Sequence, residues 1–165
     1  MARCLIVACG CRGLALARGL RAEGHGVRGT TRQPDRLAVL EAAGVEPVLA
    51  DPDRVATLAP ALDHVVVGYI LLGSAVGAPD ALAALHGSRL EMLLSKVLDS
   101  TVRGIVYEAV GSVPAAVLSA GAQRVRAFAA DAHVPHVVLE TDPADHGRWC
   151  QDALAAAASV LAPGS

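Results

Sequence analysis

A short loop near the amino terminus carries the residue types most suited to chemistry. An apolar run is followed by Val7–Leu14, VACGCRGL, in which two glycines lie three positions apart and two cysteines two apart. A glycine-rich loop between a strand and a helix binds phosphate groups, because its amides and the positive end of the helix dipole both face the anion. Closely spaced cysteines suggest a metal or redox site instead. The elements around the loop decide between these two chemistries.

Short β-branched runs alternate with longer segments rich in alanine and leucine. The expected strands are Cys4–Ala8, Gly26–Thr30, Glu46–Ala50, His64–Gly68, Gly104–Glu108 and His136–Glu140. The expected helices are Cys11–Glu23, Pro34–Ala43, Arg54–Ala61, Asp80–Leu98, Pro114–Ala132 and Ala144–Leu161. This alternation predicts an α/β fold of three layers, with helices on both faces of a parallel sheet. Right-handed crossovers favour a doubly wound Rossmann sheet of six strands in the order 3-2-1-4-5-6, formed by residues 1–165 as one domain.

In such a sheet, ligands bind beyond the carboxyl ends of the strands where the strand order reverses, and the loop VACGCRGL lies there. Gly10 and Gly13 take the second and third glycine positions of a dinucleotide-binding loop, and Ala8 takes the first. The alternative is a tight turn kept only for packing. We expect the cofactor to contact the whole loop, namely Ala8, Cys9, Gly10, Cys11, Arg12 and Gly13.

The end of the second expected strand indicates which dinucleotide would bind. NAD-binding folds usually place an acid about twenty residues past the glycines to hold the ribose hydroxyls. Here Thr31 takes that position and Arg32 follows it. A hydroxyl and a guanidinium would bind a 2′-phosphate, and Arg12 would add a second positive charge on the same side. The sequence therefore favours NADP over NAD, unless Arg32 only solvates the start of the next helix.

Residues 4–51 resemble the N-terminal half of atypical short-chain dehydrogenases, the NmrA-like and NAD-dependent epimerase-like branch. The resemblance rests on VACGCRG, on GHGVRGTTR at 24–32 and on GVEPVLAD at 44–51. It implies that Asp51 lies near the adenine and that Gly68, at the end of the fourth strand, lines the nicotinamide side. The sequence departs from the family at Ala8, which replaces the first glycine, and in its length, since members continue into a substrate-binding region.

The residues for dehydrogenase catalysis are incomplete. The resemblance implies a tyrosine four residues before a lysine that lowers its pKa. Lys96 is the only lysine, and a methionine stands four positions before it. The standard mechanism is therefore excluded. Catalytic candidates follow the fifth strand, namely Tyr107, Glu108 and Ser112, and the alternative is a strand end whose polar groups cap the next helix.

The cysteines and the composition exclude several other classes. Zinc sites usually show two pairs of ligands, and this chain has one close pair of cysteines, so no metal is expected. A redox role through Cys11 is an alternative to small residues tolerated in a tight turn. A net charge of −2 and 2% aromatic residues argue against nucleic acid as a partner. The most apolar stretch, 65–73, is about half the length of a membrane span.

The N-terminus is too short for a signal peptide, so we expect a cytoplasmic protein with reduced cysteines. High apolar content in a short chain favours a homodimer. The leading hypothesis is a dinucleotide-binding Rossmann protein, an oxidoreductase-like relative whose substrate a second subunit would enclose. The rival is a non-catalytic or degenerate module that senses the cofactor. A third possibility is a Rossmann domain for another nucleotide or an acyl carrier.

Overall fold

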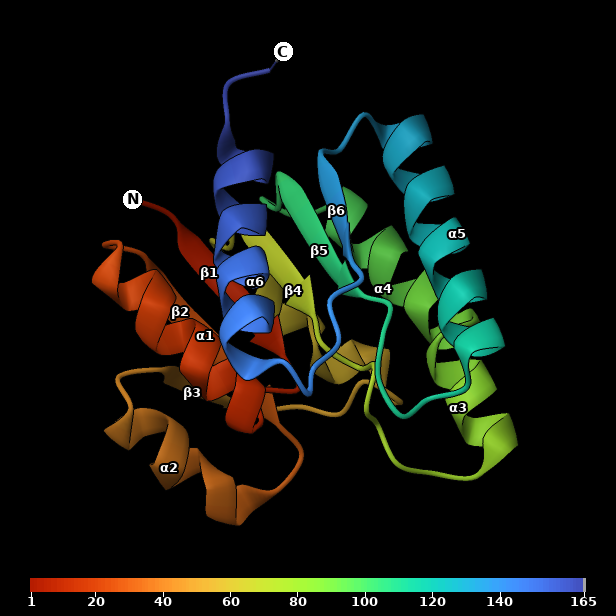
Figure 1. The fold of residues 1–165 in the computed structure, drawn as a ribbon, viewed down its shortest axis with the longest axis horizontal. Helices are drawn as coiled ribbons and strands as arrows, with labels where there is room; N and C mark the ends of the chain where they lie inside the picture. Colours follow the sequence, from red (N-terminus) through yellow and green to blue (C-terminus); the bar gives the residue numbers. More distant parts are fainter. Residues whose placement is uncertain (165) are drawn as a thin grey trace.

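The computed structural model describes residues 1–164, which build a single parallel sheet flanked by helices (Figure 1). The strand order is β3-β2-β1-β4-β5-β6, as the alternating pattern predicts. The strands are β1 (Arg3–Val7), β2 (Gly26–Thr31), β3 (Glu46–Leu49), β4 (Val67–Ile70), β5 (Gly104–Glu108) and β6 (His136–Leu139). The order reverses between β1 and β4, so the segments that follow these two strands flank the crevice where ligands bind in such folds.

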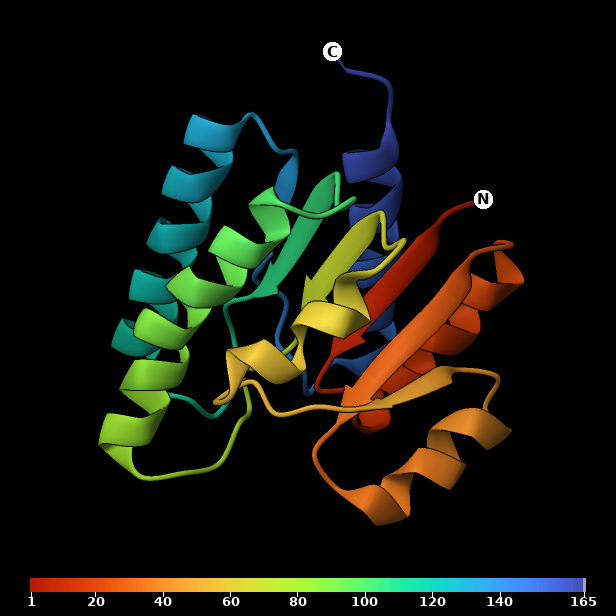
Figure 2. The ribbon, with the colours of Figure 1, turned by 180° about the vertical axis from the view of Figure 1, so that it is seen from behind.

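Helices cover both faces of the sheet. The α-helices are α1 (Cys11–Ala22), α2 (Leu37–Ala42), α3 (Pro79–Leu85), α4 (Ser88–Leu98), α5 (Ala115–Ala132) and α6 (His146–Leu161). Three 3₁₀ turns are η1 (Pro34–Arg36), η2 (Val55–Thr57) and η3 (Ala59–Leu62). Figure 1 shows α1, α2 and α6 on one face, and Figure 2 shows η2, η3, α3 and α4 on the other. Within residues 1–164, none of these helices combines the length and the apolarity that a membrane crossing requires.

Strand β1 shows how the sequence forms the two cores. Cys4 and Ile6 point into the cluster that includes α1 and α6, whereas Leu5 and Val7 point into the cluster with α4 and α5. All four side chains are at most 2% exposed. A parallel strand covered on both faces needs apolar residues at every position, which explains the continuous apolar run.

Two of the six helix predictions were wrong. The expected helix Arg54–Ala61 is the pair of 3₁₀ turns η2 and η3, and Pro60, which has no N–H to donate, lies within this segment. The expected helix Asp80–Leu98 is interrupted between α3 and α4, where Gly87 has φ −111° and ψ −106°, outside the helical region. The first of these segments still crosses one face of the sheet, so the strand order is unaffected.

The fourth strand also begins later than the sequence indicates. His64 has a left-handed φ of +61°, and the Val65 N–H donates to the Leu62 carbonyl, so the chain is still turning there. Strand pairing begins at Val67. As a result, Gly68 lies inside β4 rather than at its end.

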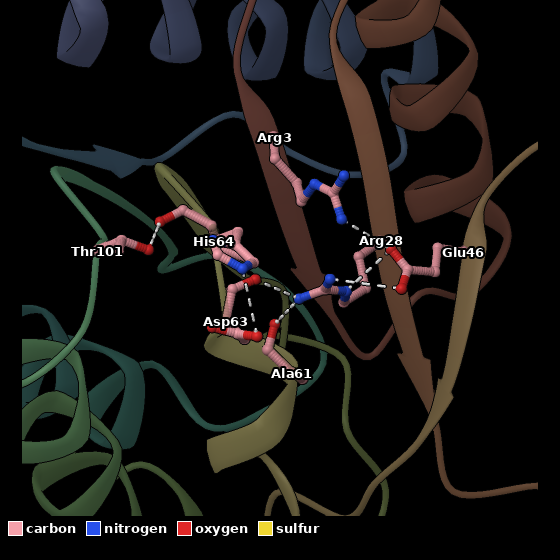
Figure 3. A network of polar contacts seen from close by, with 8 residues as sticks. Arg3, Arg28, Glu46, Ala61, Asp63, His64 and Thr101 are labelled. Atoms are coloured by element: carbon pink, nitrogen blue, oxygen red, sulfur yellow. Dashed lines mark hydrogen bonds and ion pairs between the residues drawn. The ribbon is translucent and has the colours of Figure 1, made fainter.

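A buried arginine fixes the turn that precedes β4 (Figure 3). Arg28 in β2 is 6% exposed and donates to the carbonyls of Ala61, at 2.8 Å, and Asp63, at 2.7 Å. Its Nε also pairs with the Glu46 carboxylate in β3 at 3.1 Å, and Arg3 in β1 contacts the same carboxylate at 3.3 Å. Because the buried guanidinium is both paired and hydrogen-bonded, this network holds the η3 turn against three neighbouring strands.

Candidate functional site

A cleft of about 350 Å³ opens at the carboxyl ends of the first strands. Its walls are the β1–α1 loop, the β2–η1 turn, the segment after β3, the loop after β4 and part of α3. The sequence-predicted site residues that line it are Ala8, Cys9, Gly10, Cys11, Arg12, Gly13, Thr31, Arg32 and Asp51. The fold therefore brings together nine positions spread over more than forty residues, at the place where the strand order reverses.

Ala8 has a backbone conformation that normally favours glycine. Its φ is +63°, in the left-handed region, where a β-carbon costs roughly 1–2 kcal/mol. The Ala8 N–H donates to Thr30 Oγ1 at 2.9 Å, and the Cys9 N–H donates to the Thr30 carbonyl at 2.9 Å. These bonds to β2 hold the loop in its turn despite the methyl group. The first glycine position of the loop is therefore in the left-handed conformation even though alanine occupies it.

The two glycines of the loop have different surroundings. A β-carbon on Gly10 would meet no atom within 4 Å, so its Cα faces open space at the cleft. A β-carbon on Gly13 would lie 3.1 Å from Cys9 Sγ and 3.2 Å from Ile6 Cγ2, so this residue lets α1 pack closely on β1. Gly10 leaves room for a ligand to approach the backbone, and Gly13 serves helix–strand packing.

The two loop cysteines differ in their exposure to solvent. Cys9 is 2% exposed, and a β-carbon on Gly29 would lie 2.9 Å from its Cβ, so Cys9 fills a gap that a glycine in β2 leaves. Burial raises the pKa of the Cys9 thiol to about 11, and nearby Arg36 opposes the rise. Cys11 is exposed at the start of α1. Within residues 1–164, no three histidine, cysteine or acidic side chains gather as potential metal ligands.

The end of β2 presents a polar and cationic wall. Thr31 is 8% exposed, and its Oγ1 accepts from the Gln33 N–H at 3.1 Å, which shapes the turn into η1. Arg32 is exposed and lines the cleft. Arg36, which the sequence reasoning missed, also lines the cleft, and its Nη2 donates to the Cys9 carbonyl at 3.4 Å. Its position four residues after Arg32, across a Pro-Asp turn, is the signal that could have found it.

Asp51 lies just beyond β3, in a turn that its own side chain stabilises. Its Oδ1 accepts from the Asp53 N–H at 2.9 Å, and its N–H donates to Thr57 Oγ1 at 2.8 Å. Both aspartates line the cleft next to the Thr31–Arg32 wall. The acidic groups are thus placed beyond β3, one strand away from the cationic end of β2.

Arg12 does not join Arg32 as a second free cation. Its Nη2 donates to both carboxylate oxygens of Glu108, at 2.8 and 3.0 Å, and its guanidinium carbon lies 5.4 Å from the centre of the Trp149 ring. Most of the Arg12 charge is therefore neutralised on the β5 side of the cleft. Arg12 was expected to add a second positive charge on the side of Arg32, but its guanidinium is instead paired with the buried Glu108 carboxylate.

Glu108, a weak catalytic candidate, is instead the centre of a buried network. The residue is 0% exposed. Beyond Arg12, it accepts from the Gly73 N–H and from the Trp149 indole N–H, each at 3.0 Å. Burial raises the pKa of the Glu108 carboxyl, and the donors Arg12, Gly73 and Trp149 oppose that rise. Since each of these partners donates, the arrangement suits a carboxylate, and Glu108 does not line the cleft.

Tyr107 points to the other face of the sheet and is also fully buried. His86 Nε2 lies 2.9 Å from the Leu72 carbonyl, which can only accept, so His86 Nδ1 accepts the Tyr107 hydroxyl at 2.6 Å. Burial raises the pKa of the Tyr107 phenol and lowers that of the His86 imidazole. This hydrogen bond links the residue that ends α3 to β5. Tyr107 does not line the cleft.

The two remaining site predictions also fall outside the cleft. Gly68 does not line it, because β4 continues to Ile70 and the cleft wall begins at Leu71. Ser112 is exposed in the loop before α5 and is absent from the cleft wall formed by residues 1–164. The side of the cleft expected to hold a nicotinamide ring is therefore formed by the loop after β4 and by part of α3.

Comparison with known proteins identifies the architecture. No protein-family model matches the sequence, and no curated protein matches it. Among solved structures, a short-chain dehydrogenase/reductase superfamily protein from Agrobacterium tumefaciens with bound NAD superposes with a TM-score of 0.69 at 19% identity, over 84% of this chain and 48% of that one. The two proteins share the Rossmann fold.

Two further structures support the same assignment. UDP-glucose 4-epimerase from Thermotoga maritima gives a TM-score of 0.68 at 13% identity, over 84% of this chain and 54% of the epimerase. Vestitone reductase from alfalfa gives 0.63 at 16% identity, over 84% of this chain and 56% of the reductase. This chain thus spans about half the length of the Rossmann-fold proteins that it resembles.

Proposed function

We propose that this chain binds a nicotinamide dinucleotide through its 8–13 loop, with NADP preferred to NAD, as a short form related to the atypical, NmrA-like short-chain dehydrogenases. The observation that carries the proposal is the open face of Gly10 at the cleft, next to the first turn of α1. The Gly10 N–H itself donates to the Ala8 carbonyl, so the donors available to a phosphate would be the N–H groups of the first turn of α1. A structural neighbour of the same fold contains bound NAD.

Support for NADP comes from the end of β2. An acid at this position would hold the ribose hydroxyls and repel a 2′-phosphate, whereas this chain has Thr31 there, flanked by exposed Arg32. Arg36 adds a second guanidinium to the same wall. Two guanidinium groups and a hydroxyl match the hydrogen-bonding needs of a phosphate.

The proposal concerns binding, and it assigns no proton-transfer residue. Tyr107 and Glu108 both make buried hydrogen bonds, and Lys96, on α4, has no tyrosine four residues before it.

We also propose that the chain is a single nucleotide-binding domain that works in the cytoplasm as a homodimer. Met92 and Leu98, which are 47% and 61% exposed on α4, support self-association. Light scattering of the purified protein tests the dimer.

A ligand titration tests the binding. Saturating NADPH at one hundred times its Kd should stabilise the protein by about 2.7 kcal/mol, a rise in Tm of roughly 5–10 °C for a chain of this size. Arg32→Ala should weaken NADPH more than NADH, because only NADPH carries the 2′-phosphate. The absence of a shift with either nucleotide at millimolar concentration would overturn the proposal, and equal losses in Arg32→Ala would overturn the NADP preference.

A further inference from the structure

The walls of the cleft come from one part of the chain. Every lining residue belongs to positions 8–85, and neither β5, β6, α5 nor α6 contributes one within residues 1–164. A doubly wound sheet of this order consists of two mononucleotide-binding halves, and a dinucleotide spans both. In this protein the half formed by β1, β2 and β3 opens into the cleft, together with the loop that follows β4.

The carboxyl end of β5 is closed by direct packing of two loops. A β-carbon on Gly111 would lie 2.1 Å from the Gly73 carbonyl oxygen, and the Val113 N–H donates to that oxygen at 3.0 Å. Beneath this contact, Glu108 is fully buried by Arg12 and Trp149. The loops after β4 and β5 therefore touch backbone to backbone, and no room for a ring is left between them.

The carboxyl end of β6 opens into a separate groove whose charged side chains are mostly acidic. Acidic side chains outnumber the single arginine among its lining residues, Glu140, Asp142, Asp145, Asp152 and Arg148. Thr141 donates to Asp152, which fixes one of these carboxylates within the groove. No residue lines both this groove and the cleft, so the groove does not extend the cleft toward β6.

We propose that the cleft binds one nucleoside with its phosphates, so that the adenosine diphosphate part of a dinucleotide makes the contacts and the nicotinamide riboside extends into solvent. The inference rests on the proposed function, because it assumes that the 8–13 loop binds the pyrophosphate. A volume of about 350 Å³ is at the low end of the roughly 300–1,000 Å³ of ligand pockets. The cleft is no larger because the two loops that pack together close the carboxyl end of β5.

Calorimetric titration of the wild-type protein tests the inference without any variant. The ligands are NADPH, NADP, and the 2′-phosphate of ADP-ribose, which lacks the nicotinamide. All three should bind within about threefold of one another, because each has the same contacting part. NADPH fluorescence should keep its emission maximum in the complex. An affinity for NADPH more than about thirtyfold tighter than for the ADP-ribose derivative, or a blue-shifted emission, would overturn the inference and leave the proposed function standing.

The other outcomes are equally informative. If none of the three ligands binds, the proposed function fails, and the inference fails with it. Glu140→Lys is a matched variant, since this exposed side chain lies at the carboxyl end of β6, away from the cleft. The ratio between NADPH and the ADP-ribose derivative should not change in this variant. A change of more than about threefold for NADPH alone would place the nicotinamide half over β5 and β6 and contradict the inference.

Discussion

Arg12 and Glu108 lie 96 positions apart in the sequence and form an ion pair in which one guanidinium nitrogen donates to both carboxylate oxygens, at 2.8 and 3.0 Å. Arg12 is 26% exposed and Glu108 is 0% exposed. The pair links the first turn of α1 to the end of β5. Of the two residues, only Arg12 lines the cleft.

Glu108→Ala should destabilise the protein by roughly 3–5 kcal/mol, because it leaves the Arg12 charge and the Gly73 and Trp149 N–H groups without their partner. Urea unfolding measures the change. Glu91→Ala is the control, since Glu91 pairs with Arg124 at an exposed site and should contribute less than about 1 kcal/mol. Similar losses in both variants would refute the structural role of Glu108.

Ala8→Gly should raise the free energy of unfolding by up to about 1 kcal/mol, because glycine accepts a φ of +63° without strain. The same change at Ala127, an exposed position inside α5, should lower it by about 1 kcal/mol. Thermal unfolding of the two variants therefore gives shifts of opposite sign. Destabilisation by both would show that the Ala8 methyl contributes more packing than strain.

Gly10→Ala should affect mainly the affinity for NADPH, and Gly29→Ala should affect mainly the stability of the fold. The Gly10 β-carbon would face open space in the cleft, so stability should change by less than about 0.5 kcal/mol while NADPH binding weakens. The Gly29 β-carbon would lie 2.9 Å from Cys9 Cβ, so overpacking should cost about 1–3 kcal/mol. Unfolding and titration measurements on both variants check this. Unchanged NADPH affinity in Gly10→Ala would contradict the cleft assignment.

Acidic pH should weaken the fold through His86. Burial lowers the pKa of this imidazole below its usual 6.5, so the unfolded chain takes up a proton that the folded chain does not. Stability should be full above about pH 6.5 and fall by up to about 1.4 kcal/mol per pH unit as the pH drops toward the folded-state pKa. Urea unfolding between pH 7.5 and 5 measures this slope. His86→Gln should remove most of it, and an unchanged slope would assign the effect to another group.

Arg36→Ala should weaken NADPH binding by about tenfold, the factor for one charge-assisted hydrogen bond of about 1.4 kcal/mol, and NADH binding by less. Arg36 lines the cleft beside Arg32, whereas Arg18 is exposed on α1 and does not. Arg18→Ala therefore controls for net charge. Calorimetry on the two variants decides the role, and equal effects of both substitutions would remove Arg36 from the site.

The strand order and the position of the 8–13 loop at the cleft could be predicted because their signals are local. Each strand is a short apolar run, and parallel strands joined by right-handed crossovers leave few possible orders. The third expected helix was wrong for a local reason as well, because Pro60 lies within Arg54–Ala61 and has no N–H to donate to a continuing helix. The break at Gly87 was harder to predict, since the segments on both sides favour a helix.

Whether the side chains of Tyr107 and Glu108 reach the cleft could not be predicted, because this depends on contacts between distant segments. Glu108 became a structural residue through Arg12 and Trp149, which lie 96 and 41 positions away. Tyr107 is fully buried and hydrogen-bonded to His86, 21 positions away, and it does not line the cleft. A single sequence shows which side chains could do chemistry, and the tertiary packing determines which of them reach the ligand.

The network around Glu108 has a consequence for folding kinetics. Its members come from the start of α1, the loop after β4, the end of β5 and the first turn of α6, so the network is complete only when the last helix has docked. Contacts of such long sequence separation slow folding, because the loops must close before the contacts form. Trp149 is the only tryptophan of the chain and is 1% exposed within this network. Its fluorescence during refolding therefore reports the moment at which the network around Glu108 is assembled.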